Sequence, residues 1–432
     1  MTSSSTNVAE PPEVSRLVEH LFRHEGAKIV ATLARIFGIE HLGLAEDVVQ
    51  EALARALQTW PFYGVPKNPA AWIVCTSRNL ALDVVRRENV FRDKEAQIVQ
   101  LMDRQTPAPD EAGSIDHGIT DDTLRMMFVC CHPVIPPEAQ VALALKTLCG
   151  FGVTEISRAF LTTDAAIAKR LTRAKQRIRE ERIAFEIPAG RELRRRLDGV
   201  LQSLYLLFNE GYKASSGDKL VREDVCQEAI RLTRLLAEHE SGNQPRTHAL
   251  LALMLLNAAR IQTRVDDEGN LLRLKEQDRS RWDQRMIAQG MFHFAQSAAG
   301  ERITEYHLQA GIAACHCAAK EYASTNWRQI LSLYDQLIEL DDSPVIALNR
   351  AVAIAQVHGP KAGIEAVAAI QDRQSLESYY LFYAVLGEFE EQLNDPLAAA
   401  GYFRKSMHLA GSKSEQKFLL KRFRACESQL RA

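Results

Sequence analysis

A capped, strongly basic helix is the first stretch whose residue types could do chemistry. It is expected within LTTDAAIAKRLTRAKQRIRE, residues 161–180, and its cations are Lys169, Arg170, Arg173, Lys175, Arg177 and Arg179. A helix in the DNA major groove needs base contacts in its N-terminal half and flanking cations for phosphates. Ala165, Ala166 and Ala168 leave little bulk where such a helix would enter. The pattern therefore favours DNA binding over a merely solvated basic face.

A second short helix precedes the basic one, in GFGVTEISRAFLTTD. Thr154 is expected to cap it by accepting a hydrogen bond from a first-turn amide, and Thr163 or Asp164 is expected to cap the basic helix. The tight connection between the two predicts a helix-turn-helix. The inward-facing residues are expected to be Ile156, Phe160, Ile167 and Leu171.

The whole chain does not share this charge. Its 432 residues carry a formal net charge of −2, which argues against indiscriminate coating of nucleic acid. Residues 158–196 nevertheless contain twelve Lys and Arg against five Asp and Glu, so the positive charge is local. The length predicts two or three domains. No signal peptide and no membrane-spanning run of apolar residues is found, so we expect a cytoplasmic protein with no membrane partner.

The elements that must position these residues are all helices, because apolar residues recur at spacings of three and four and alternating runs are nearly absent. The predicted fold class is all-α. Two small helical domains are expected at 13–92 and 121–186, joined by a flexible linker at 93–120 that is rich in Asp, Glu, Pro and Gly. A third helical domain is expected at 191–432.

The last domain contains a weak internal repeat. Ala366 with Ile370 and Ala399 with Phe403 form small-then-large pairs 33 residues apart, and Leu386-Gly387 precede the second pair. This spacing loosely resembles tetratricopeptide (TPR) helix pairs. An irregular helical domain with Ala-rich packing faces is the alternative.

Two cysteine-histidine clusters could suggest metal ligands, CCHP at 130–133 and CHC at 315–317. Structural zinc needs four converging ligands, whereas neighbours along a helix point apart. Buried packing is the stronger interpretation, and the eight cysteines are expected to be reduced. We predict no metal and no cofactor.

No catalytic constellation emerges. The segments FNEGY, with Glu210 and Tyr212, and RSRWDQRMI, with Trp282, Asp283 and Arg285, are more simply explained by salt bridges between helices or by a peptide groove. No phosphate-binding Gly loop, HExxH or GxSxG motif is present. We therefore predict no enzyme and no catalytic residue.

The N-terminal block contains two further helices with polar faces. The first, AEDVVQEALARAL, presents Asp47, Gln50 and Glu51. The second, AAWIVCTSRNLALDVVRRE, mixes Trp72, Ser77 and Asn79 with cations. Recognition of unpaired bases requires aromatic, amide and guanidinium groups of this kind, although Trp72 taken alone is better explained as a core residue.

Together these stretches resemble the sigma-70-like initiation factors, specifically the compact extracytoplasmic-function (ECF) group. AEDVVQEAL looks like the helix that docks on RNA polymerase, WIVCTSRNLALDVVRR like the helix that melts and reads the −10 promoter element, and residues 136–179 like the −35-reading domain. The resemblance covers roughly residues 13–185. The remaining residues resemble an ECF subgroup with a large TPR-like extension.

The resemblance implies roles for individual residues. Core RNA polymerase would be contacted by Asp47, Gln50 and Glu51. The −10 element would be handled by Asn79, Asp83, Arg86 and Arg87, with the loop at 60–68 capturing a flipped base. The −35 element would be read by Thr163, Lys169, Arg170, Arg173 and Lys175. Many family members carry Gly-Thr and then Lys where this chain has Ala165, Ala166 and Ala168.

The function implied is promoter-specific initiation by core RNA polymerase, with promoter DNA as the second partner. The C-terminal domain would modulate activity and could bind a regulatory protein or peptide. Two alternatives remain. One is a conventional helix-turn-helix regulator with a helical sensor domain that acts without core polymerase, and the other is a repeat-type adaptor whose basic helix is incidental.

Overall fold

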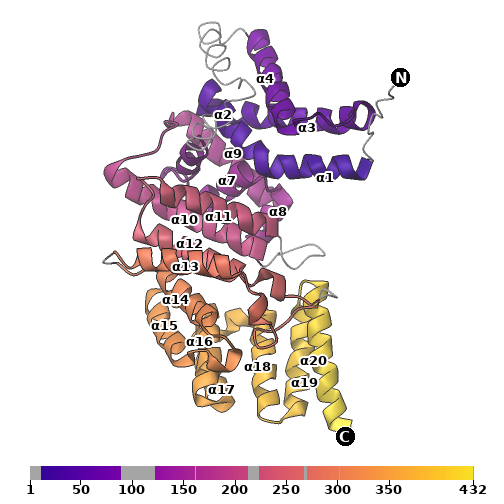
Figure 1. Ribbon diagram of the computed structural model, residues 1–432, viewed down its shortest axis with the longest axis vertical. Coiled ribbons are helices and arrows are strands. Elements are labelled where there is room, and N and C mark those ends of the chain that lie inside the picture. Colours follow the sequence, from indigo (N-terminus) through magenta and orange to yellow (C-terminus); the bar gives the residue numbers. More distant parts are fainter. Residues whose placement is uncertain are drawn as a thin grey trace. The chain divides into compact units, whose positions relative to one another are not determined.

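The computed structural model describes residues 11–88, 122–160, 162–212, 223–266, 270–300 and 302–431. Within these ranges the regular elements are all helices, apart from an isolated β-bridge between Val265 and Leu271, so the predicted all-α class is confirmed. The chain forms two compact units, Met1–Leu207 and Phe208–Ala432. Figure 1 shows the helices of each unit (Figure 1).

The first unit contains both predicted N-terminal domains. Its helices before the gap at 89–121 are α1 (Pro11–Leu21), a π-helical turn η1 (Phe22–Gly26), α2 (Ala27–Phe37), a 3-10 turn η2 (Ile39–His41), α3 (Leu42–Tyr63) and α4 (Pro69–Glu88). After the gap come helical residues 122–130, then α7 (Pro137–Cys149), α8 (Val153–Ala159), α9 (Asp164–Glu180) and most of α10 (Gly190–Tyr212).

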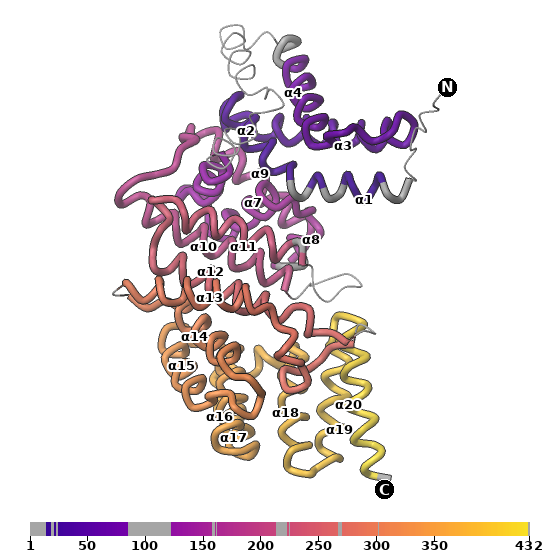
Figure 2. Tube along the Cα trace, viewed as in Figure 1, coloured from indigo at the N-terminus to yellow at the C-terminus, as the bar shows by residue number. Residues whose placement is uncertain are grey.

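Figure 2 traces α3 and α4, which a short turn joins (Figure 2). The loop expected at 60–68 begins later than expected, because α3 continues through Pro61 to Tyr63 and ends where Gly64 adopts φ +84°. Proline has no N–H to donate to the carbonyl four residues earlier, so Pro61 removes one backbone hydrogen bond from the last turn of the helix. Asn68 then accepts the Ala71 amide at 3.1 Å and so starts α4.

The second unit is built around a helix that is buried on all sides, α12 (Pro245–Ala258), as an all-round apolar sequence predicts. Its other α-helices are α11 (Glu223–Glu238), α13 (Gln284–Ser297), α14 (Glu305–Ala318), α15 (Trp327–Leu340), α16 (Pro344–His358), α17 (Pro360–Ala368), α18 (Tyr380–Gln392), α19 (Pro396–Leu409) and α20 (Lys413–Arg431). The short 3-10 turns are η3 (Ile261–Thr263), η4 (Arg279–Arg281), η5 (Tyr322–Ser324) and η6 (Arg373–Leu376). From α14 to α20, each helix packs on the next one in the chain.

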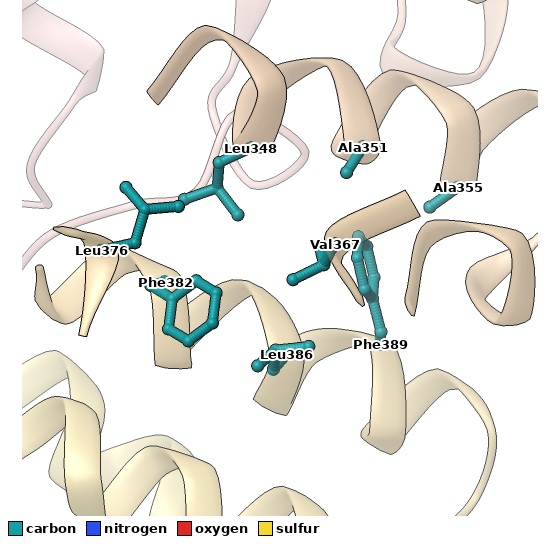
Figure 3. Packing of buried hydrophobic residues seen from close by; sticks show 8 residues of the cluster. All are labelled: Leu348, Ala351, Ala355, Val367, Leu376, Phe382, Leu386 and Phe389. Carbon is teal, nitrogen blue, oxygen red and sulfur yellow. The ribbon is translucent and has the colours of Figure 1, made fainter. Parts of the chain in front are cut away.

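Small residues let these consecutive helices approach closely. A Cβ added at Gly363 would lie 2.7 Å from the Ala355 Cβ and 2.9 Å from the Phe389 ring, in the cluster that Figure 3 shows (Figure 3). A Cβ at Gly387 would lie 2.9 Å from the ring of Phe403. Each glycine therefore admits an aromatic ring or a neighbouring helix that any larger residue would push away.

A carboxylate with three cationic neighbours joins the loop after η3 to the last helices. Glu388 of α18 contacts Arg273 at 2.9 Å, Lys275 at 2.6 Å and Arg422 of α20 at 2.7 Å. Burial opposes its charge, but these cations lower its pKa to about 2. The network fixes three separate segments around one charge.

Candidate nucleic-acid interface

The start of the basic helix α9 is held by three hydroxyl groups. Thr163 is its N-cap and accepts the Ala166 amide at 3.2 Å, as predicted. The hydroxyls of Thr154 and Ser157 in α8 donate to the carboxylate of Asp164 at 2.6 and 2.5 Å. The helix-turn-helix is thus fixed by hydrogen bonds between its two helices.

The predicted cap of the preceding helix is wrong. Thr154 lies inside α8 and its hydroxyl faces α9, whereas the Glu155 carboxylate accepts the Gly152 amide at 2.8 Å. A carboxylate in the first turn can accept the amide of the residue before the helix, and it also interacts favourably with the helix dipole. Thr154 is thereby available to bridge the two helices.

The inward faces agree with the sequence pattern. Ile156, Ile167 and Leu171 are buried, while Phe160 is only half-buried. The Arg170 guanidinium lies 6.0 Å from the centre of the Phe160 ring. Arg170 also pairs with Glu138 of α7 at 2.9 Å, so it stabilises its own domain.

Two of the proposed −35 residues share an exposed face of α9. Lys169 and Arg173 are one turn apart, and Ala165 is exposed one turn before them. In the part of the chain that the structure describes, neither cation forms an ion pair. This face can approach phosphates and base edges without first breaking an internal contact.

Lys175 lies elsewhere. Its Nζ contacts Glu46 Oε2 of α3 at 2.5 Å, and the Thr147 hydroxyl donates to Glu46 Oε1 at 3.2 Å. The Glu46 side chain is only 9% exposed. The structure thus pairs Lys175 with a carboxylate from the other predicted domain.

The acidic face of α3 is as the sequence implied. Asp47, Gln50 and Glu51 are exposed, at spacings that place them on one side of the helix. Glu51 also pairs with Arg55 at 3.0 Å on the surface. The buried Glu46 lies one turn before Gln50.

The candidate −10 residues lie along α4. Asn79 and Asp83 are exposed and one turn apart. Arg86 and Arg87 belong to the last turn of α4, and their side chains are outside the described residues. Trp72 is half-buried and meets the buried Trp60 edge-on at 5.4 Å between ring centres. The ring therefore packs between α3 and α4, in line with its expected core role.

Two neighbouring aromatic residues were missed as individual site residues. Phe62 is 78% exposed and Tyr63 is 87% exposed, in the last turn of α3. Large exposed aromatic side chains side by side are costly unless a partner covers them. The sequence signal was the pair of aromatics immediately before Gly64, where the helix must end.

The cysteine-histidine clusters behave as packing residues. Burial raises the pKa of Cys131 to about 12, and Cys130 is also buried. Burial, with help from Arg260 and Arg279, lowers the pKa of His316 to about 3, so its ring is neutral. Within the described ranges, no three His, Cys, Asp or Glu side chains could hold a metal ion.

Tyr212, in the FNEGY segment, contacts two arginines of the second unit. The Tyr212 hydroxyl accepts from Arg260 at 2.7 Å, and the Arg264 guanidinium lies 4.0 Å from the ring centre. Arg264 also donates to the Tyr212 carbonyl. In RSRWDQRMI, Asp283 caps α13 by accepting the amides of Arg285 and Met286.

No helix in the described part of the chain is long and apolar enough to cross a bilayer.

Comparison with known proteins gives two family matches within this chain. Residues 21–90 match the family model described as sigma-70 region 2, and residues 196–298 match a family of unknown function, DUF6596. The uncharacterized protein R00370 of Rhizobium meliloti (strain 1021) is 37% identical over 392 residues, which cover 90% of this chain and 91% of that protein.

A more distant relative has a descriptive name. The probable ECF RNA polymerase sigma factor SigI of Mycobacterium tuberculosis is 24% identical over 170 residues, which span 39% of this chain and 57% of that protein. No solved structure matches the chain significantly. The chain therefore belongs to the same family as R00370, and its region 2 makes it a sigma-70 family factor.

Proposed function

We propose that the protein is an ECF-type initiation factor that binds core RNA polymerase and directs it to promoters carrying specific −10 and −35 elements. One observation carries this proposal. A sigma-70 region 2, with its polar residues exposed on α3 and α4, precedes a helix-turn-helix in the same compact unit. Hydrogen bonds from threonine and serine hydroxyls hold the two helices of that helix-turn-helix together. The role requires no catalytic residue, and it places the protein in the cytoplasm with polymerase and DNA.

The polymerase contact is assigned to the exposed face of α3. Asp47, Gln50 and Glu51 combine two carboxylates with an amide, and a basic surface on polymerase would complement them. The probable sigma factor SigI is named as an RNA polymerase factor, which supports the same partner here.

The −10 element is assigned to α4 and the turn before it. Asn79 and Asp83 can form hydrogen bonds with the edges of unpaired bases, while Phe62 and Tyr63 provide rings on which bases can stack. Captured bases would offset the unstacking cost of a few kcal/mol per step.

The −35 element is assigned to the α9 face containing Ala165, Lys169 and Arg173. Arginine paired with guanine is the commonest base-specific contact in the major groove. Thr163 fixes the start of the helix, and Arg170 positions it through Glu138. Lys175 can join these residues only when its pair with Glu46 is open.

The C-terminal helices are proposed to form a TPR-like domain that modulates initiation and binds a regulatory protein or peptide. The support is the close approach of successive helices, in which Gly387 of α18 faces Phe403 of α19. These are the residues that the repeat pattern in the sequence singled out.

Arg173→Ala tests the −35 assignment. On promoters that core polymerase and the parent protein use, this substitution should lower the rate of initiation about tenfold or more. The reason is that one arginine–base contact contributes roughly 1–3 kcal/mol. Run-off transcript yield at fixed salt is the measurement. Arg191→Ala, which removes an exposed cation outside α9, is the matched control. Equal yields from both variants would remove Arg173 from the recognition surface.

A further inference from the structure

The connection between α12 and α13 is much longer than the packing of these two helices requires. The helices pack directly on each other, and helices packed in this way are usually joined by about 2–8 residues. Here residues 259–283 lie between them. The ends of this loop meet, because the Asp283 amide donates to the Ala259 carbonyl at 2.9 Å. The chain thus leaves the helix pair and returns to the same place, and long loops in compact domains usually serve a function.

The tip of this loop, residues 271–278, reaches the last helices of the second unit (Figure 1). Nη1 of Arg273 donates to both carboxylate oxygens of Glu388 in α18, at 3.0 and 2.9 Å. Nζ of Lys275 donates to the same carboxylate at 2.6 Å. Glu388 also pairs with Arg422 of α20 at 2.7 Å. The loop tip is therefore docked on α18 and α20 through one carboxylate.

Charge, rather than apolar packing, holds the loop tip in place. None of residues 271–278 is buried, and the leucines among them are half-buried. Arg273 Nε and Gln277 Oε1 are shielded from solvent and have no hydrogen-bond partner, whereas buried polar groups in a protein core are almost always paired. The base of the loop is different, since Arg279 is 8% exposed and Trp282 is 3% exposed. The loop tip can therefore leave α18 while the base of the loop stays packed.

The surface under the loop tip has an excess of negative charge. This acidic site consists of Glu388 and Glu391 of α18, which share Arg422 of α20 as a partner. The side chains of Glu388 and Glu391 are only 23% and 22% exposed, so water compensates poorly for a lost cation. The site favours a cationic ligand, because a largely buried carboxylate is costly without a partner.

We propose that the acidic site binds an arginine-bearing basic peptide of a regulatory protein, and that the loop tip fills the site until such a peptide displaces it. The loop tip itself shows the required chemistry, because it offers two cations, Arg273 and Lys275, to Glu388. A tethered segment competes at an effective concentration of about a millimolar. A partner must therefore bind the acidic site more tightly than the isolated tip does. The inference rests on the proposed regulatory role of the C-terminal helices.

Binding of the tip sequence as a separate peptide tests the proposal. The probe is a fluorescein-labelled peptide of residues 270–278, NLLRLKEQD, added to the full-length protein and followed by fluorescence anisotropy. In the tip variant, Arg273→Ala with Lys275→Ala, the protein's own tip no longer holds Glu388. We expect the tip variant to bind the peptide at least about tenfold more tightly than the parent. The reason is that occupation of the site in the parent lowers the apparent affinity by the fraction of free sites.

Matched controls identify the residues responsible. Arg350→Ala removes an ion pair with Asp335 between α16 and α15, and this variant should bind the peptide as weakly as the parent does. A peptide with alanine at both cationic positions should not bind the tip variant, and this control needs no further change in the protein. Adding Glu388→Gln to the tip variant should abolish binding, while Glu391 keeps its pair with Arg422.

Equal affinity of the parent and the tip variant overturns the proposal, and so does binding that persists with the alanine peptide or with Glu388→Gln. Run-off transcription with the full-length parent tests the proposed function separately. A protein that initiates, but whose tip variant does not bind the peptide, contradicts this inference alone. A protein that binds the peptide as expected, but does not initiate with core polymerase, contradicts the proposed function alone.

Discussion

Replacing Phe62 and Tyr63 together by alanine is expected to reduce open-complex formation on duplex promoters about 100-fold or more. Both rings are largely exposed at the end of α3, and Asn79 and Asp83 are exposed on the next helix, α4. Stacking of a base on an aromatic ring contributes roughly 1–3 kcal/mol, and every 1.4 kcal/mol or so is a factor of ten. Two lost stacking partners therefore account for the size of the effect.

Permanganate reactivity of unpaired thymines with core polymerase measures this loss. A template with a premelted −10 region should restore most of the activity, because its bases are already unstacked. Leu57→Ala is the matched control, since Leu57 is an exposed apolar residue earlier on α3. If the premelted template fails to rescue the variant, the two rings act in something other than melting.

The second large effect concerns stability. Phe403→Ala is expected to destabilise the α18–α20 region by about 3–5 kcal/mol, the usual cost of removing a buried phenylalanine. Phe403 is 1% exposed, its ring meets the backbone at Gly387, and the Arg422 guanidinium lies 5.3 Å from the ring centre. Alanine would leave a cavity that none of these neighbours can fill without moving a helix.

Hydrogen exchange of the α18–α20 amides gives the local free energy of opening. Leu397→Ala on the same helix α19 is the control, because it removes a side chain that is 70% exposed. It should change the local free energy of opening by less than about 0.5 kcal/mol. Equal protection in both variants would mean that Phe403 is not part of the packing between these helices.

Local features of the fold could be predicted from the sequence because they depend on neighbouring residues. Helix spacing predicts the all-α class, and the position of Thr163 or Asp164 before the basic run predicts a cap, which the structure assigns to Thr163. The buried side of α9 also followed from spacing, since Ile167 and Leu171 lie one turn apart.

Features that depend on packing between distant segments could not be predicted. Lys175 was assigned to DNA by its position in a basic helix, yet its partner Glu46 lies 129 residues away in the chain. Nothing near Thr154 revealed that its hydroxyl would face Asp164 rather than its own helix. Exposure also required the structure, because Trp60, Phe62 and Tyr63 all lie in the last turn of α3 and, of the three, Trp60 alone is buried.

The proposed role in initiation is tested most directly by run-off transcription with purified core RNA polymerase, the full-length protein and a library of genomic promoters. We expect transcripts with defined starts, from promoters that share −10 and −35 elements and only when both polymerase and this protein are present. The contradicting result would be no transcript from any promoter, while the protein alone binds specific duplex sites. That outcome would identify a conventional helix-turn-helix regulator instead of an initiation factor.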